Sequence, residues 1–408
     1  MSLIKPFRAL RPAPGRAAEV LAPPYDVLSS AEARERAKSR PWSFLHVSKA
    51  EIDLDPATNP YDRTVYARAA RNLQRMVAEG VLTRDDKPFY YVYRLTWRGQ
   101  TQTGLAAVAS TAAYASNRIR KHEYTTPAKE DDRVRQIEAV NAQTGPAMLA
   151  YPTTPTIDGL LAGATAGDPV VDVTADDGVR HQLWLVKDAA TIMALTDAVE
   201  NLPALYIADG HHRSAAALRI AQARGGEGSH NYFLTVLFPQ NEMTILDYNR
   251  VLRDLNGRSV SEVLAEIGKR YSVVPTGGPA RPAGTAEIGM FLSGRWYRLT
   301  LRPEAAAKAG QDPVGHLPVT LLHRNIIEPI FAVADPRRDK RIDFIGGGRG
   351  LGELERVVAS GQMAVAFALY PTLMRDFMAV ADAGAIMPPK STWFEPKLAD
   401  GMVSHVLD

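Results

Sequence analysis

The stretch LYIADGHHRSAAALRI, residues 205–220, constrains the fold more than any other part of the sequence. An apolar run ends in Asp209-Gly210, and an alanine-rich stretch follows two histidines and Arg213. Glycine allows the tight backbone turn that joins a strand directly to a helix. We therefore expect a strand up to Asp209 and a helix from about 211 to 224. Three consecutive alanines, 215–217, would let that helix lie close against a sheet.

Other segments alternate between strand and helix patterns on both sides of this stretch. YFLTVLF, residues 232–238, is an almost continuous apolar run, which is typical of a strand covered on both faces. PFYYVYRLTW (88–97) and TGLAAVAST (103–111) are expected to pair as antiparallel strands across Arg98-Gly99-Gln100. Residues 66–82 predict an amphipathic helix with Val77 on its apolar face. The pattern indicates a mixed α/β chain. Because antiparallel pairs are expected, the α+β class is the alternative.

The length of 408 residues predicts more than one packed lobe. We expect an N-terminal α/β segment (1–150), a central α/β segment (151–274) and a C-terminal α/β segment (285–408), although the three could pack as one unit. PTGGPARPAG, residues 275–284, is the expected linker or exposed hairpin loop.

Composition excludes several kinds of chemistry. The chain has no cysteine, so disulfides, thiolate metal sites and a cysteine nucleophile are excluded. No apolar run approaches the roughly 20 residues of a membrane span, and the first residues lack the apolar core of a secretory signal. These features predict a soluble, cytoplasmic protein. A net charge of +3 without a basic block disfavours nucleic acid as a partner and suits a phosphorylated small molecule.

The DGHHR segment carries the strongest candidate site. A helix N-terminus offers unpaired N–H groups and a positive dipole, and Gly210 lets a ligand approach the backbone. Arg213 would bind phosphate with its planar guanidinium, and His211 is an alternate for proton transfer. Asp209 would act as base or bind Mg²⁺ through water. The alternative is that Asp209 only caps the helix and that the histidines are solvated.

Two further segments are candidates for phosphate binding. FIGGGRGLGELERV has a glycine loop with Arg349 but no dinucleotide fingerprint, and such a loop is often only a turn. GAIMPPKST cannot be a P-loop, because Pro389 stands where the second glycine must be. The loop still offers candidate phosphate ligands: Lys390, Ser391, Thr392 and Lys397. Alternatively, the aromatics Trp393 and Phe394 pin this segment to the core.

The segment RKHEYTTPAKEDDR, residues 120–133, combines charges of both signs with a histidine. His122 and Glu123 are candidates for proton transfer, and Glu130 and Asp131 are weaker candidates for a metal. The alternative is that these acids lie in the first turn of a helix, where the helix dipole favours them. The PPYD segment, with Tyr25 and Asp26, is interpreted primarily as a turn and only secondarily as part of a site.

Five motifs together, PFRALRP, PPYDV, KHEYTTPAKEDDR, YIADGHHR and MPPKSTWFEPKL, resemble in order and spacing the motifs of the bacterial and archaeal domain of unknown function 1015 family. The resemblance runs from about residue 5 to 405. Locally, YIADGHHRSAAAL is similar to the phosphate-binding box of the ParB/sulfiredoxin fold, which includes CTPase switches, sulfiredoxins and free serine kinases. The resemblance implies a ParB/sulfiredoxin-like core elaborated by additional N- and C-terminal α/β segments.

That local resemblance also implies roles for residues. Gly210 and Arg213 would bind phosphate, His212 would line it, and Asp209 would parallel the catalytic acid of the kinase branch. Without cysteine, sulfiredoxin chemistry is excluded. The expected function is a phosphotransfer enzyme acting on a small metabolite such as free serine, with Mg²⁺ and with ATP or ADP as co-substrate. The alternatives are a phosphohydrolase, of the phosphoserine phosphatase kind, at the same site and a non-catalytic nucleotide-binding switch. A homo-oligomer is compatible with each.

Overall fold

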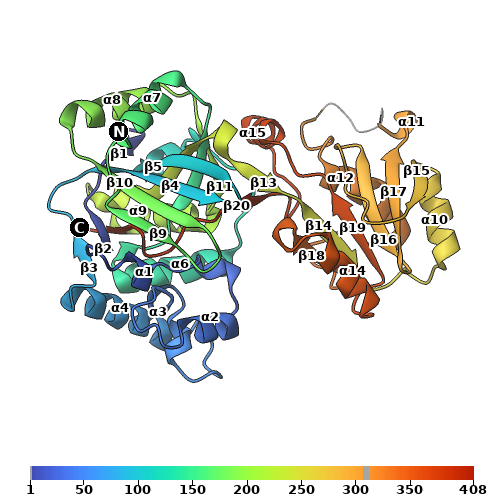
Figure 1. Ribbon diagram of the computed structural model, residues 1–408, viewed down its shortest axis with the longest axis horizontal. Coiled ribbons are helices and arrows are strands. Elements are labelled where there is room, and N and C mark those ends of the chain that lie inside the picture. Colours follow the sequence, from blue (N-terminus) through green and yellow to red (C-terminus); the bar gives the residue numbers. More distant parts are fainter. Residues whose placement is uncertain (1, 307–311) are drawn as a thin grey trace. The chain divides into compact units, whose positions relative to one another are not determined.

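The computed structural model describes residues 2–306 and 312–408 (Figure 1). Contacts between residues divide the chain into two compact units. The first consists of Met1–Met243 with Pro396–Asp408, and the second of Thr244–Glu395. This division differs from the three segments expected from the sequence. The boundary expected at residue 150 falls inside a buried strand of the first unit, Ala147–Tyr151. This strand pairs with a neighbour on each side, which holds its two ends in one sheet.

A large mixed sheet forms the centre of the first unit, in the order β6-β11-β8-β12-β5-β4-β10-β9, with β1 paired to β5. Its strands are β1 (Ile4–Lys5), β4 (Tyr90–Trp97), β5 (Gln100–Ser110), β6 (Ile119–Arg120), β8 (Ala147–Tyr151), β9 (Val171–Thr174), β10 (Arg180–Val186), β11 (Leu205–Asp209) and β12 (Tyr232–Pro239). The pairs β11–β6 and β12–β8 are parallel and the others antiparallel. The α+β class expected from the sequence is confirmed.

Local sequence explains two features of this sheet. All eight residues of β12 are buried, which confirms the predicted strand covered on both faces. β4 and β5 form the expected antiparallel hairpin. Its turn residues Arg98 and Gly99 have φ of 49° and 78°, the left-handed conformation that matches the twist of a two-residue hairpin.

Helices surround this sheet in the first unit (Figure 1). They are α1 (Ala17–Val20), α2 (Ser30–Ala37), α3 (Leu45–Ser48), α4 (Arg63–Ala78), α5 (Thr111–Ala115), α6 (Pro127–Val140), α7 (Pro155–Ala164), α8 (Ala189–Glu200) and α9 (His211–Arg224), with the 3-10 helices η1 (Tyr25–Val27), η2 (Ala50–Asp53), η3 (Ser229–Asn231) and η4 (Gln240–Glu242).

Helix α4 begins earlier than its apolar pattern suggested, because the Asp62 side chain accepts a hydrogen bond from the Thr64 N–H and caps the helix. Its buried residues are Val65, Tyr66, Ala69, Leu73 and Met76. The placement of Val77 on the apolar face was wrong. Its side chain is exposed because the buried stripe follows residues three and four apart from Tyr66 to Met76.

A second, smaller sheet brings both ends of the first unit together. Its order is β3-β2-β21-β7, built from β3 (Leu82–Arg84), β2 (Ala9–Pro12), β21 (Ser404–Val406) and β7 (Ala142–Gln143). Because β21 pairs with β2 and β7, residues 396–408 return to the first unit. This return brings Lys397 and Asp400 near the DGHHR segment, residues 209–213.

The second unit has a six-stranded antiparallel sheet in the order β15-β17-β16-β19-β14-β18 and a separate pair β13–β20. Its strands are β13 (Thr244–Leu246), β14 (Tyr248–Leu252), β15 (Tyr271–Thr276), β16 (Glu287–Leu292), β17 (Arg295–Leu301), β18 (Ile342–Gly346), β19 (Val365–Leu369) and β20 (Trp393–Glu395). Its helical segments are α10 (Val260–Gly268), α11 (Pro303–Ala306), α12 (Pro318–Leu322), η5 (His323–Ile327), α13 (Glu328–Phe331), η6 (Gly347–Arg349), α14 (Leu351–Ala359) and α15 (Met374–Asp382).

Residues 275–284 lie within this second unit, between β15 and β16. Both strands pair with β17 rather than with each other, so the segment is neither a linker between units nor a hairpin loop. Pro275 and Thr276 still belong to β15. β16 and β17 form an antiparallel hairpin, with Ser293-Gly294 at its turn.

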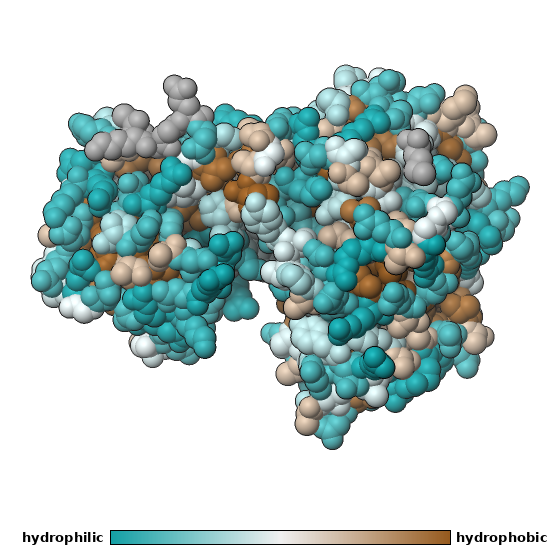
Figure 2. Space-filling model, turned by 180° about the vertical axis from the view of Figure 1, so that it is seen from behind, coloured by the Kyte–Doolittle hydropathy of each residue, from teal (hydrophilic) through white to brown (hydrophobic). Residues whose placement is uncertain are grey.

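The face of the molecule drawn in Figure 2 is predominantly polar. Hydrophilic residues cover most of the face seen in Figure 2, and apolar residues form small separate patches there. Within residues 2–306 and 312–408, none of the helices has the length and apolarity that crossing a membrane requires.

Candidate functional site

The junction between β11 and α9 forms the corner that the sequence predicted. β11 ends at Asp209, and α9 begins at His211. Between them Gly210 has φ of +98°, a backbone conformation that is strained for any residue with a side chain. A Cβ at Gly210 would also stand 3.0 Å from the Cα of Ala147 on β8. Glycine is therefore needed both for the turn and for the close approach of β8.

Small residues seat α9 against the rest of the first unit. Ala215, Ala216 and Ala217 are buried, and α9 packs against α5 and α6. This packing fixes the first turn of α9, where N–H groups lack partners within the helix. Ala215 and Ala217 share a buried cluster with residues of the sheet, such as Leu149 of β8 and Ile207 of β11, which confirms the expected contact of α9 with a sheet.

Two cations meet Asp209 at this corner. An Nη of Arg213 donates to Asp209 Oδ2 at 2.6 Å, and Lys397 Nζ lies 3.6 Å from Asp209 Oδ1. Burial alone would raise the pKa of Asp209, but the charges of Lys397 and Arg213 outweigh it and hold that pKa well below its usual range. Asp209 is thus a carboxylate throughout the physiological range. Such a group orients cations and hydroxyls better than it removes protons.

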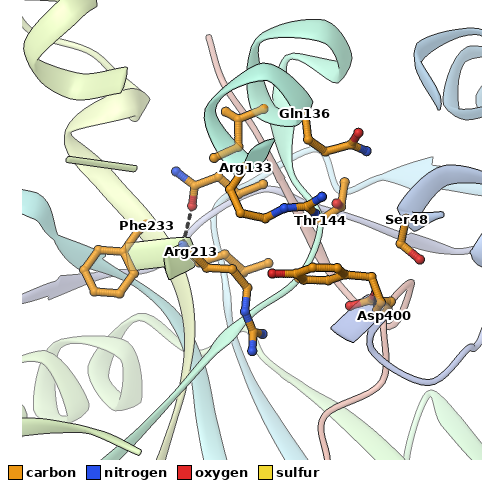
Figure 3. Close-up of a pocket in the computed structure, with 12 residues that line it drawn as sticks. Ser48, Arg133, Gln136, Thr144, Arg213, Phe233 and Asp400 are labelled. Atoms are coloured by element: carbon orange, nitrogen blue, oxygen red, sulfur yellow. Dashed lines mark hydrogen bonds between the residues drawn. The ribbon is translucent and has the colours of Figure 1, made fainter. Parts of the chain in front are cut away.

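Arg213 is surrounded by further acceptors. It donates to the carbonyl of Pro146, and its Nη lies 3.9 Å from Asp26 Oδ2. It also lines a cavity of about 30 Å³, around which Arg133 of α6 and Asp400 of the C-terminal segment lie (Figure 3). Such a volume holds one or two water molecules, not a nucleotide. A ligand would therefore have to reach Arg213 from the open side, where Asp209 and Asp26 are partly exposed.

Asp400 differs sharply from Asp209. Burial raises the pKa of Asp400 to about 7, and the nearby Arg213 only partly opposes that shift. The N–H of Tyr25 donates to Asp400 Oδ2 at 3.2 Å, whereas Oδ1 has no hydrogen-bond partner among the described residues. Asp209 and Asp400 both lie near Arg213, yet the pKa of Asp209 is lowered and that of Asp400 is raised.

The histidines form a second group beside this corner. The rings of His122 and His211 meet edge to face with centroids 4.4 Å apart, and Glu123 Oε2 lies 4.0 Å from His211 Nδ1. Burial lowers the pKa of His122 to about 4 and that of His211 well below 6.5. His212 accepts a hydrogen bond from the Thr126 N–H at 3.1 Å, and burial lowers its pKa to about 4 as well. All three imidazoles are neutral at pH 7.

Two other acidic candidates of the 120–133 segment pair with a cation of α9. Glu130 and Asp131 form ion pairs with Arg219 of α9, at 3.5 Å and 2.8 Å. Such pairs are expected of acids near the start of a helix, and they leave both carboxylates already neutralised. Their assignment as metal ligands stays a prediction.

The remaining phosphate candidates belong to the second unit. They are Arg349, Lys390, Ser391 and Thr392. Arg349 lies 3.7 Å from Glu353, and the hydroxyl of Ser391 donates to the carbonyl of Pro388. Their assignment to phosphate binding also stays a prediction.

Three residues near Arg213 were missed or undervalued by the sequence interpretation. Asp400 was not selected, Arg133 was not assigned a role, and Asp26 was treated as a turn residue. The guanidinium of Arg133 stacks 3.9 Å from the ring centre of Tyr25, which positions the PPYD turn. The one local signal was Asp400-Gly401, a second Asp-Gly pair, in which Gly401 has φ of +85°. Acidic turns are common, so that signal does not distinguish a site.

Two larger cavities lie elsewhere in the first unit. One, of about 400 Å³, includes Lys5, Arg8, Arg84, Tyr232 and His405 in its lining. The other, of about 340 Å³, includes Trp42, His46, Asp53, Arg68 and Asn72. Neither contains a residue of the DGHHR segment, although Pro6, Phe7 and Arg8 of the PFRALRP motif line the first.

Comparison with known proteins relates the chain to several solved structures at low similarity. A conserved hypothetical protein from Pyrococcus furiosus is 12% identical, with 73% of this chain and 94% of that chain covered and a TM-score of 0.35. A free serine kinase in complex with AMP is 10% identical, with 73% and 92% covered and a TM-score of 0.34. SbnI with a C-terminal truncation, from Staphylococcus aureus, is 11% identical, with 73% and 86% covered and a TM-score of 0.39.

No curated protein matches the sequence. A family model described as "Protein of unknown function (DUF1015)" matches residues 4–320, which include the PPYD turn, the 120–133 segment and the whole β11–α9 corner. The match spans well over half of the chain and agrees with the resemblance seen in the sequence motifs. The chain belongs to this family.

Proposed function

We propose that the β11–α9 corner binds a phosphate group and that the protein transfers a phosphoryl group between a nucleotide and a small metabolite. One observation carries the proposal: Arg213 and Lys397 both reach Asp209 at the N-terminus of α9. Two cations, a helix dipole and a glycine turn at one partly exposed point supply the positive field that a phosphoryl group requires. The resemblance of residues 206–218 to the ParB/sulfiredoxin phosphate-binding box supports the same placement.

Each residue has a definite part in this proposal. The N–H groups of the first turn of α9 bind phosphate oxygens, and Lys397 neutralises their charge. Asp209 stays ionised and accepts a hydrogen bond from the acceptor hydroxyl, which orients the oxygen for attack. Gly210 keeps the backbone close enough for direct contact. Asp26 Oδ2 lies 3.9 Å from the guanidinium of Arg213, and the nearby negative charges keep that guanidinium ionised.

Mg²⁺ fits this arrangement. It takes oxygen ligands and is commonly bound by one or two carboxylates together with substrate phosphates. Asp209 and Asp26, both next to Arg213 and both partly exposed, are the residues that would hold it. When bound, it would neutralise charge on the transferred group.

A nucleotide, ATP or ADP, is the proposed donor and free serine the first acceptor to test. The sharpest measurement is phosphorus NMR of the purified protein with Mg²⁺. One sample holds ATP or ADP with serine, and the other holds phosphoserine alone. A new phosphomonoester signal in the first sample is the expected result. Asp209→Asn should abolish it, and Asp86→Asn, which changes an exposed aspartate in the same way, should not.

The other outcomes separate the alternatives. Inorganic phosphate released from phosphoserine alone would identify a phosphohydrolase at the same corner. Nucleotide signals that broaden without any turnover would favour a binding switch. If nucleotide signals stay unchanged in every sample, including with other hydroxyl acceptors, the phosphate assignment of the corner is wrong.

A further inference from the structure

A compact group of metal-ligating side chains stands beside the phosphate corner. His122 and Glu123 follow β6, and His211 is the first residue of α9. One donor atom from each of the three side chains lies within 4.8 Å of the others. No other group of three such ligands that close together occurs in the part of the chain that the structure describes.

The burial of the two histidines calls for an explanation. His122 is 2% exposed and His211 is 4% exposed. Nε2 of His211 is buried and has no hydrogen-bond partner among the described residues. Buried polar atoms nearly always have a partner, and those without one often mark a missing water or ion. A cation bound to this nitrogen would give it the partner that it lacks.

Both imidazoles are prepared for ligation. Both rings are buried, so the surrounding packing holds them in a fixed orientation. His122 also hydrogen-bonds to the backbone of Ile207 on β11. Metal-binding histidines almost always use their second nitrogen in such a bond, which fixes the orientation of the ring.

We propose that His122, His211 and Glu123 bind a divalent transition-metal ion of the zinc type. Two imidazoles and one carboxylate form a ligand set found at zinc sites that keep an open position for water or substrate. Nitrogen ligands select zinc and its neighbours, whereas Mg²⁺ and Ca²⁺ prefer oxygen alone. This site is therefore distinct from the oxygen site that Asp209 and Asp26 would offer to Mg²⁺.

Binding requires a small closure around the ion. Ligand atoms about 2.1 Å from one tetrahedral ion lie about 3.4 Å from each other, closer than the separations in the structure. Glu123 is the ligand that moves, because its side chain is 47% exposed while the histidines are fixed by packing. The ion would then stand next to Gly210, with its open position available to an oxygen of a ligand on the same loop.

The test measures metal binding in the absence of any nucleotide, so its failure is distinguishable from failure of the phosphate proposal. Protein stripped with a chelator is titrated by calorimetry with Zn²⁺ and, separately, with Mg²⁺. We expect one equivalent of Zn²⁺ to bind at least about 100-fold more tightly than Mg²⁺. Co²⁺ in place of Zn²⁺ should give the visible absorption bands of a site with nitrogen ligands.

Variants distinguish this site from adventitious binding to surface histidines. Glu123→Gln and His211→Ala should each weaken Zn²⁺ binding by at least about tenfold. His212→Ala, which removes the neighbouring histidine, is the matched control and should leave the affinity nearly unchanged. Because Glu123 is half exposed, Glu123→Gln tests the site even where His211→Ala does not fold. Equal affinity in wild type and Glu123→Gln, or no Zn²⁺ binding by the wild type, would overturn the proposal.

Discussion

Lys397 Nζ lies 3.6 Å from Asp209 Oδ1, although one residue ends the β11 strand and the other follows β20 near the C-terminus. The lysine side chain is 18% exposed and the aspartate 30%. This pair therefore sits at the surface of the first unit rather than in its core. Lys397 is therefore well placed to release Asp209 and bind an anionic ligand.

Lys397→Met keeps the length of the side chain and removes its charge. We expect this variant to bind ADP about tenfold more weakly, a loss of about 1.4 kcal/mol. Calorimetry of both proteins at the same ionic strength measures the difference, since salt screens such contacts. Lys87→Met, at an exposed position, is the control. Unchanged affinity in Lys397→Met would remove Lys397 from the phosphate site.

Gly210→Ala should destabilise the first unit by roughly 2–4 kcal/mol, because φ of +98° is strained for alanine and the new Cβ would crowd Ala147. Gly80→Ala is a matched comparison, since Gly80 also has positive φ but has open space at the Cβ position. We expect that change to cost only about 1 kcal/mol. Urea unfolding gives both values. Equal costs would show that contact with Ala147 contributes nothing.

Asp400 should make stability depend on pH. Burial raises its pKa from 3.8 to about 7, so between these values the folded protein holds a proton that the unfolded chain has lost. The contribution of Asp400 to stability therefore falls as pH rises from about 4 to 7. Asp400→Asn removes this dependence, so its stability relative to wild type should improve by on the order of 3 kcal/mol between pH 4 and pH 8. Urea unfolding across that pH range measures the change. Parallel pH profiles of the two proteins would contradict the assignment.

His46 and Asp53 form an independent pair in the cavity beside Trp42, with His46 Nδ1 2.7 Å from Asp53 Oδ1. The hydrogen bond to Asp53 raises the pKa of His46 despite partial burial. The stabilisation is present below the ordinary histidine pKa near 6.5 and is lost as pH rises through the raised value. Asp53→Asn should lower the His46 pKa, measured by NMR. It should cost about 1 kcal/mol more at a pH of about 5.5 than at a pH of about 9. A His46 pKa that does not move would refute the coupling.

Local sequence predicted the backbone of the candidate site well. Asp209-Gly210 between an apolar run and an alanine-rich run predicted the end of β11 and the start of α9 to the residue. The hairpin of β4 and β5 was also predicted, although its second strand begins at Gln100, inside the expected turn. These features depend on conformational preferences that act over a few neighbouring residues, which is why a sequence reveals them.

Tertiary structure alone decided which charges meet. Lys390 and Lys397 stand in the same sequence motif, yet they belong to different units because β20 pairs with β13 while the chain after it joins the first unit. Asp400 becomes a buried acid beside Arg213 only through this return of the C-terminal segment. Its protonation depends on desolvation by residues distant in sequence. Local patterns determined where the β11–α9 corner lies, and only long-range packing determined the charges that surround it.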